Sequence, residues 1–307
     1  MNLLIDTDPG VDDALAILMA LADPGVRLLG LSIAAGNVGL GHTTRNALKL
    51  LEVAGRDDVP VFAGSPLPLL PTDEHAAFVH GRDGFGDTAC LPPRRAASDE
   101  HAVHAILRLS REVAGDLTLV ALAPLTNVAL ALRLDPELPT RVSRLVVMGG
   151  AVTGRGNLER RAVEFNFGFD PEAAAMVMEA FPRIELVDWE ATLAHAVDES
   201  VFLDMMGQDN HRARFYRAIF RRTLEFQRRF HPGHVHSADA LAMAVVLEPE
   251  AVEEVSERAV WIETGGRDTR GMSMVDWERH SARPPRTRIV TRVTQSRFEA
   301  RLASALA

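Results

Sequence analysis

The residues with the clearest chemical potential lie near the start of the chain. Four aspartates, Asp6, Asp8, Asp12 and Asp13, fall within eight positions, where an apolar run ends and a helical pattern begins. A single aspartate at such a junction could simply cap the helix, because helix N-termini favour negative groups. Four aspartates are more than a helix cap requires. Bringing them together is also costly, since two like charges about 4 Å apart repel by about 4 kcal/mol at an effective dielectric near 20. Carboxylates gathered in this way would become protonated or recruit a cation.

The rest of the composition narrows the identity of that cation. The chain has a single cysteine, Cys90, which excludes an intramolecular disulfide and a cysteine-based zinc cluster. Ligands that are all oxygen atoms favour a hard ion, Ca²⁺ or Mg²⁺. An EF-hand loop starting at Asp6 is excluded, because Ile17 stands where its last acidic ligand is required. A haloacid-dehalogenase pattern fails at Gly10, and no glycine-rich dinucleotide loop follows the first apolar run.

The elements that must position these aspartates follow an alternating pattern. Short apolar runs predict buried strands at 3–6, 26–34, 117–122 and 145–148, and helical periodicity predicts helices over 12–22 and about 43–53. Strands that alternate with helices form βαβ units, so we expect an α/β fold with a mostly parallel central sheet flanked by helices. We expect one domain, residues 1–307. Ligands of such sheets bind beyond the carboxyl ends of the strands, where the aspartates lie.

The remaining chain combines two long loops with further elements. Residues 64–100 are rich in Pro, Gly, Asp and His and form too long a segment for a passive connection, and 80–87 predict an ordered, ligand-facing loop. A second such loop spans 149–168. Arginines interleaved with aromatic residues over 212–229 predict an amphipathic helix with a solvated basic face. Further predicted elements are a helix over 239–247, strands at 260–263, 272–277 and 287–293, and a last helix from about Gln295.

Bulk composition excludes several classes of function. With 47% apolar and 24% charged residues, the chain has the composition of an ordinary globular protein. The formal net charge is −9, and no block of Lys and Arg provides the basic face that nucleic-acid binding needs. The first apolar run is too short for a signal peptide, and no apolar window is long enough to cross a bilayer. We therefore expect a cytoplasmic protein with a small-molecule partner, and neither nucleic acid nor membrane as a partner.

Residues 5–17 closely resemble the N-terminal signature of the inosine-uridine-preferring nucleoside hydrolases. Further matches follow in the family's order at 35–37, 80–81, 123–129, 148–151, Asn157, 164–166, 170–174, 263–266 and 269–271. The resemblance spans nearly the whole chain and implies the Rossmann-like fold of this family. It also implies hydrolysis of the N-glycosidic bond of ribonucleosides to ribose and free base, by a chain that assembles into a homodimer or homotetramer.

The resemblance further implies a role for each matching residue. The matching ligands of a Ca²⁺ ion are Asp8, Asp13, Asp239 and the main-chain carbonyl of Leu122. In the family this ion also binds the ribose hydroxyls and the attacking water, which Asp8 activates as general base. Asn37 matches a catalytic residue beside the sugar and the base. The residues that match substrate-binding groups are Asp12, Met148, Asn157, Glu164 and Asn166. Such roles suit the chemistry, because carboxylates and amide dipoles stabilise an oxocarbenium-like transition state.

The chain departs from the family pattern where the leaving base would be protonated. Many family members have a histidine directly before the last metal ligand, and this chain has Ala238 there. His231, His234 and His236 stand just upstream, and His80 lies on the first long loop. We expect His80, whose His-Gly context matches the family, to be the catalytic acid, with His236 as the second candidate. Residues 189–190, Trp-Glu, also replace the more usual Leu-Asp pair.

Alternatives stay open at this point. Taken singly, Asn157 and Asn166 could be loop-forming residues and Glu164 a surface charge. The chain could be a nucleoside-binding protein that kept the metal and lost turnover, which Ala238 favours. It could also hydrolyse a related ribosyl compound, such as a nicotinamide or modified riboside. Turnover of a nucleoside panel separates the first alternative from an enzyme, and relative kcat/KM values separate the second.

Overall fold

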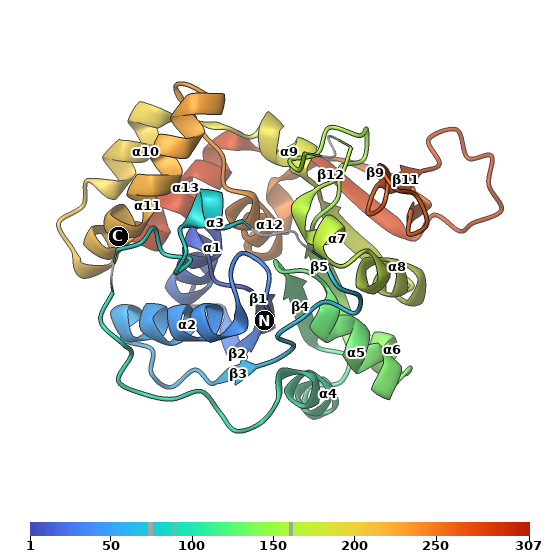
Figure 1. Cartoon of the computed structure of the whole chain (residues 1–307), viewed down its shortest axis with the longest axis horizontal. Coiled ribbons are helices and arrows are strands. Elements are labelled where there is room, and N and C mark those ends of the chain that lie inside the picture. The colour runs from blue at the N-terminus through green and yellow to red at the C-terminus, as the bar shows by residue number, and fades with distance from the viewer. Residues whose placement is uncertain (73–75, 89, 160–161) are drawn as a thin grey trace.

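An eight-stranded sheet forms the centre of the molecule (Figure 1). The computed structural model describes residues 1–72, 76–88, 90–159 and 162–307. In spatial order the strands are β3 (Val61–Ala63), β2 (Arg27–Ile33), β1 (Asn2–Thr7), β4 (Leu117–Ala121), β5 (Val142–Met148), β6 (Ile184–Val187), β12 (Thr287–Val293) and β9 (Val252–Arg258). Neighbours pair in parallel, except β12 and β9, which are antiparallel. The mostly parallel sheet predicted from the sequence is confirmed.

Helices cover both faces of the sheet because the central strands are apolar on both sides. In β1, Leu3 and Ile5 belong to one hydrophobic cluster and Leu4, between them, belongs to the other. The first cluster contains residues of α1 (Val11–Ala22), α2 (Leu40–Ala54), α10 (Glu199–Met206), α11 (His211–Phe230), α12 (Ala238–Leu247) and α13 (Gln295–Leu306). The second contains residues of α4 (Ala102–Glu112), α5 (Thr126–Leu134), α6 (Leu138–Arg141) and α8 (Pro171–Ala180). No helix within the described ranges has the length and apolar character to cross a membrane.

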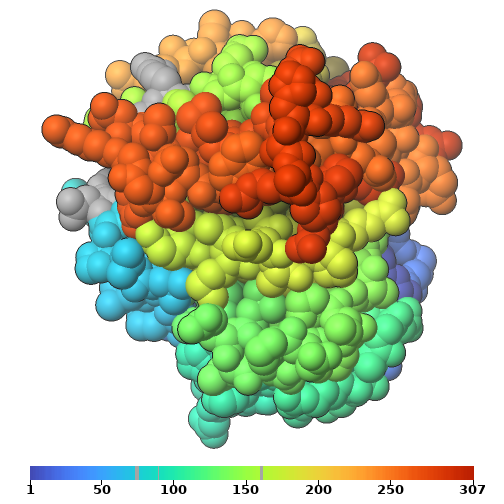
Figure 2. All heavy atoms as spheres, turned by 90° about the vertical axis from the view of Figure 1, so that its right-hand side faces the viewer, coloured from blue at the N-terminus to red at the C-terminus, as the bar shows by residue number. Residues whose placement is uncertain are grey.

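Short elements complete the fold. They are α3 (Ala77–His80), α7 (Phe165–Phe169), α9 (Trp189–Ala194), a 3₁₀ turn at Pro249–Ala251, the antiparallel pair β7 (Val197–Asp198) and β8 (His234–Val235), and the antiparallel pair β10 (Val260–Ile262) and β11 (Ser273–Val275). The predicted strands near 260 and 273 thus form a separate ribbon outside the main sheet. In Figure 2 this C-terminal part of the chain, coloured orange to red, covers the upper part of the visible face.

Several elements were not predicted from the sequence, for identifiable reasons. Strand β9 carries four charged residues in seven positions, because it lies at the sheet edge and its side chains meet solvent. Strand β6 has only four residues and β3 only three, so neither gives a periodic signal. Helices α4, α5 and α8 were not predicted either. The predicted helices over 12–22, 43–53, 212–229 and 239–247 are confirmed as α1, α2, α11 and α12, with small shifts of their ends.

A buried polar cluster ties together the carboxyl ends of β1 and β2 and the start of α5. The Asp6 carboxylate accepts hydrogen bonds from Ser32 Oγ and from Asn127 Nδ2, the latter at 3.0 Å. Asn127 also donates to the Ile33 carbonyl at 3.1 Å and accepts from the Ser65 amide at 2.9 Å. Burial raises the pKa of Asp6 to about 6, while the bonds from Ser32 and Asn127 act in the opposite direction. This cluster fixes the point at which the chain leaves β1.

We expect Asn127→Ala to lower the free energy of unfolding by about 2–4 kcal/mol, because it leaves several buried groups without a partner. Urea unfolding monitored by circular dichroism measures the loss. Asn2→Ala is the matched control: its amide donates to Asp116 at the exposed surface, so its effect should stay within about 0.5 kcal/mol. Equal effects of the two substitutions would show that the cluster does not stabilise the fold.

Candidate active site

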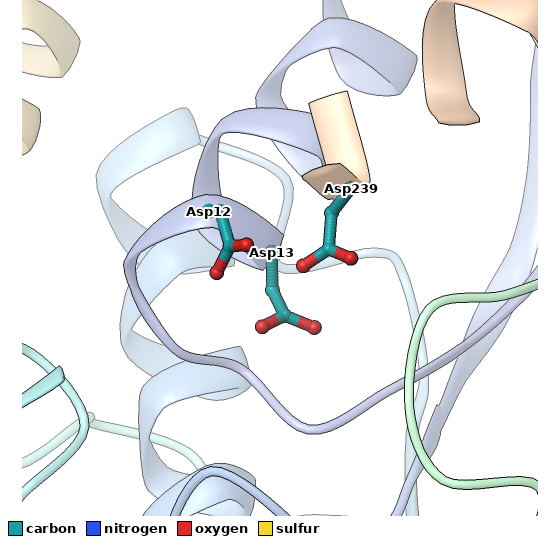
Figure 3. A group of neighbouring side chains, drawn as sticks. All are labelled: Asp12, Asp13 and Asp239. Carbon is teal, nitrogen blue, oxygen red and sulfur yellow. The ribbon is translucent and has the colours of Figure 1, made fainter. Parts of the chain in front are cut away.

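Three aspartate carboxylates converge where two helices begin. Asp12 and Asp13 lie in the first turn of α1, and Asp239 lies in the first turn of α12. Figure 3 shows the three side chains approaching one another from the two helix starts. One carboxylate oxygen of each lies within 4.8 Å of the others. Both helices direct the positive end of their dipoles at this point, which favours the negative charges there.

Asp13 is held by four hydrogen bonds. Its Oδ1 accepts from Thr7 Oγ1 and from the Asp8 amide at 3.2 Å. Its Oδ2 accepts from the Gly10 amide at 2.9 Å and from Asn37 Nδ2 at 3.0 Å. Both oxygens are therefore fixed, and the charge is distributed over four donors. Such a network is what permits a carboxylate to be fully buried.

Asp8 is fixed through the loop after β2. The Asn37 amide donates to Asp8 Oδ2 at 2.6 Å, and the Asn37 side chain donates to the Asp8 carbonyl at 3.1 Å. A Cβ atom at Gly36 would lie 2.2 Å from Asp8 Oδ2, so only glycine allows this approach. Asn37 thus positions both Asp8 and Asp13, a function that its sequence match did not indicate.

The electrostatics of the cluster call for a cation. Burial, followed by the neighbouring Asp13, raises the pKa of Asp8 well above its usual range. Burial raises the pKa of Asp12 to about 6, and burial with the surrounding aspartates raises that of Asp239 well above its usual range. Asp12 Oδ1 is buried and has no hydrogen-bond partner within the described ranges. A hard cation would relieve the repulsion and satisfy this oxygen, so the residues fit a metal site.

A cavity of about 1000 Å³ opens above the cluster. Nine of the residues expected from the sequence line it: Asp12, Asn37, His80, Leu122, Met148, Asn157, Glu164, Asn166 and Asp239. The remaining two, Asp8 and Asp13, are buried beneath it beside the same carboxylates. The structure therefore gathers all eleven of these residues in one place, whereas His234 is exposed and does not line this cavity. It also places Asp12, expected as a substrate-binding residue, in the carboxylate cluster itself.

The loops after β4 and β5 are joined by two polar side chains. Glu164 caps α7 by accepting from the Asn166 amide at 2.8 Å, and it also accepts from the Gly150 amide at 2.8 Å. Asn166 donates to the carbonyls of Leu122 at 2.7 Å and Met148 at 3.2 Å. Burial raises the pKa of Glu164 to about 7, with the backbone amides acting in the opposite direction. These bonds order the wall of the cavity that faces the cluster.

The ring of His80 is hydrogen-bonded to the start of α1. Its Nδ1 accepts from the Val11 amide at 3.2 Å, so the neutral ring carries its proton on Nε2. Nε2 lies 3.9 Å from Asp12 Oδ1. Burial lowers the pKa of His80 to about 4. Of the predicted ligand-facing loop 80–87, His80 is the residue that lines the cavity.

One part of the cavity, here called its aromatic end, is lined by aromatic residues that the sequence prediction missed. The aromatic residues there are Phe78, Trp189, Tyr216, Phe220, Phe226 and Phe230. Four of them lie on α11, whose arginines face outward as predicted. The signal was available in the three- and four-residue spacing of the lining positions Tyr216, Phe220, Thr223, Gln227 and Phe230, which marks one helix face but not what that face lines.

The hydrogen bonds of Glu190 give a structural reason for the glutamate of the unusual Trp-Glu pair at 189–190. Its carboxylate accepts from the Thr153 amide and hydroxyl, each at 2.8 Å, and from the Arg155 amide at 2.8 Å. These bonds tie the loop after β5 to α9. The same loop carries Asn157, which lines the cavity and accepts from the Phe165 amide at 2.8 Å. Glu190 therefore positions one wall of the cavity, and its neighbour Trp189 forms part of the aromatic end.

The fold and the site define an α/β enzyme whose cavity lies over buried carboxylates at the carboxyl edge of a parallel sheet. The family model described as inosine-uridine preferring nucleoside hydrolase matches residues 3–300. The chain belongs to this family, and it is an N-glycosyl hydrolase of ribonucleosides.

Relatives support this membership along the full length. A pyrimidine-specific ribonucleoside hydrolase of Salmonella paratyphi C is 34% identical over 100% of this chain and 98% of its own. An uncharacterised protein of Schizosaccharomyces pombe is 37% identical over 90% of this chain and 89% of its own. Among solved structures, an inosine-guanosine nucleoside hydrolase superposes with a TM-score of 0.92 at 31% identity, covering 99% of this chain and 98% of that one.

We expect Glu190→Ala to raise KM for a nucleoside more than it lowers kcat, because the loop that carries Asn157 loses three anchoring bonds. The loss in kcat/KM should be about fivefold, the equivalent of about 1 kcal/mol. Steady-state kinetics measure it. Glu190→Gln keeps one acceptor oxygen and should fall between wild type and Glu190→Ala. Unchanged KM in both variants would mean that the loop needs no anchor.

Proposed function

We propose that the enzyme works with one Ca²⁺ ion, held by Asp8, Asp13, Asp239 and the Leu122 carbonyl. The observation that carries the proposal is that one carboxylate oxygen of each of Asp12, Asp13 and Asp239 lies within 4.8 Å of the others, and Asp8 is buried next to Asp13. A set of ligands made only of oxygen atoms suits this hard cation. When bound, the ion would coordinate the sugar hydroxyls, and its positive charge would lower the pKa of a bound water.

Asp8 serves as the general base in this proposal. The Asn37 amide occupies its Oδ2, which leaves Oδ1 for the water that attacks the anomeric carbon. Without the ion, burial and then Asp13 raise the pKa of Asp8, so a bound cation would offset this effect and keep the carboxylate ionised. A carboxylate of this kind, held in a fixed position, can take a proton from water in the transition state.

The groups along the cavity wall bind the ribose. The ribose hydroxyls are bound by Asp12, Asn157, Glu164 and Asn166, and Met148 lies along the sugar ring. Their carboxylates and amide dipoles stabilise the positive charge that develops on the sugar as the glycosidic bond breaks. The base then extends toward the aromatic end. Named relatives include both pyrimidine-specific and inosine-guanosine enzymes, and the aromatic end, which would contact the base, is where this chain would set its own preference.

We expect chelation of the metal to destabilise the protein more at about pH 7.5 than at about pH 5. The cluster carboxyls have raised pKa values in the fold, about 6 for Asp12. A carboxyl raised in this way favours the folded state below its unfolded pKa of about 3.9 and loses that contribution as pH rises through the folded pKa. The metal-free protein therefore carries the full repulsion at the higher pH. At a thousandfold excess over Kd, restored Ca²⁺ should add about 4 kcal/mol.

Thermal unfolding with chelator and with restored Ca²⁺, at both pH values, measures this effect. Asp13→Asn should remove most of the response to Ca²⁺, while Asp209→Asn, which alters an exposed carboxylate paired with Arg214, should keep it. Elemental analysis of the purified enzyme should find about one Ca²⁺ per chain. Zinc or iron in its place, or an unchanged response in Asp13→Asn, would contradict the assignment.

We expect 2′-deoxynucleosides to be poor substrates. A buried polar site built for a hydroxyl rejects an analogue without it by factors of about 10⁴, because its own groups then lack partners. The measurement is kcat/KM for inosine against 2′-deoxyinosine and for uridine against 2′-deoxyuridine. Comparable values within either pair would show that the 2′-hydroxyl is not bound as proposed.

A further inference from the structure

Two adjacent side chains at the aromatic end of the cavity have no partner for a buried polar atom. His236 is 8% exposed and its Nδ1 is buried, and Ser237 Oγ beside it is buried as well. Neither atom has a hydrogen-bond partner in the part of the chain that the structure describes. Both residues line the cavity. The His236 ring therefore makes no hydrogen bond to a described residue through Nδ1, although it lines the cavity.

The His236 ring is held in place without the use of its nitrogens. Gln227 of α11 clamps the main chain of His236: it accepts from the amide at 2.9 Å and donates to the carbonyl at 2.8 Å. The ring centroid lies 4.5 Å from that of His231 and 6.5 Å from that of Trp189. Packing and the main-chain clamp therefore fix the ring, and both ring nitrogens stay free of protein hydrogen bonds in the described structure.

The surroundings of His236 determine which nitrogen carries the proton. A buried N–H without an acceptor costs more than a buried bare lone pair, so Nδ1 is the unprotonated nitrogen and Nε2 carries the hydrogen. Burial, followed by His231 and His234, lowers the pKa of His236 to about 4, so the ring is neutral at neutral pH. His236 thus provides the cavity with one neutral N–H donor at Nε2.

His80, the other histidine of the cavity, is differently placed. Its Nδ1 is occupied by the Val11 amide and its Nε2 faces Asp12 Oδ1. Its one N–H is therefore directed to the carboxylate cluster, where the sugar binds in the proposed function. The base needs a donor of its own, and Ala238, directly before Asp239, offers none.

We infer that His236 is a catalytic residue, which donates a hydrogen bond from Nε2 to the departing base. The inference rests on the proposed function of the site. As the bond from C1′ to the base nitrogen breaks, its electron pair moves to the base, while the water oxygen bonds to C1′ and its proton goes to Asp8. The negative charge on the base is stabilised by the His236 N–H, and the released base takes a proton from solvent. A neutral imidazole can act in this way as an electrophile.

The experiment compares two kinds of leaving group in one variant. The substrates are a natural nucleoside, inosine or uridine, and p-nitrophenyl riboside, whose leaving group departs without such help. In His236→Ala we expect kcat/KM for the nucleoside to fall about 10²-fold, the usual cost of one such donor. Activity on p-nitrophenyl riboside should stay within about threefold of wild type. His236→Phe, which keeps an aromatic ring beside His231 and Trp189 without an N–H, should show the same selective loss.

Controls separate this function from general damage. His234→Ala removes an exposed histidine of the same turn and should leave both substrates unaffected. Equal loss of both substrates in both His236 variants, or a selective loss in His80→Ala instead, overturns the inference. If the wild type is active and His236→Ala turns over the nucleoside unchanged, the inference is overturned and the proposed function stands. A wild-type enzyme inactive on both substrates overturns the proposed function, and the inference with it.

Discussion

The mutual repulsion of carboxylates is the constraint on which the rest of the structure depends. Asp8, Asp13 and Asp239 are buried together with half-buried Asp12, although two such charges about 4 Å apart repel by about 4 kcal/mol at an effective dielectric near 20. The fold offsets this cost with two helix N-termini, with main-chain amides and with the side chain of Asn37. The remaining repulsion is what makes the cluster a suitable site for a cation.

The two parts of the cavity are built from different kinds of structure. The end over the carboxylates is built from strand ends and short loops, whose polar groups are locked to one another, as Asn166 is to the Leu122 carbonyl. The aromatic end is built largely from α11 and the turn before α12, where aromatic side chains provide contact area with few directional bonds. A sugar common to all substrates suits the first arrangement. A base that differs between relatives suits the second, because stacking tolerates changes that hydrogen bonding does not.

Sequence reasoning succeeded where the determining residues are neighbours along the chain. The four N-terminal aspartates sit at one strand-helix junction, so their shared location followed from the pattern alone. Long-range partners gave no such signal: Glu190 reaches Thr153 across 37 positions, and Gln227 meets His236 only because the chain turns back between them. Strand β9 was missed because an exposed edge strand does not require the apolar residues by which strands are recognised.

The two margins of the central sheet are both protected. At one side β3 is three residues long, and the segment before α4 covers it: the Ser98 amide donates to the Val61 carbonyl at 2.8 Å. At the other side β9 is lined with charge, and Arg292 of β12 pairs with Glu253 at 3.2 Å and Glu254 at 3.3 Å. Short, covered or charged edges resist pairing with a strand of another molecule. Both edges therefore resist extension of the sheet by a second copy of the chain, which guards the enzyme against edge-to-edge aggregation while it folds.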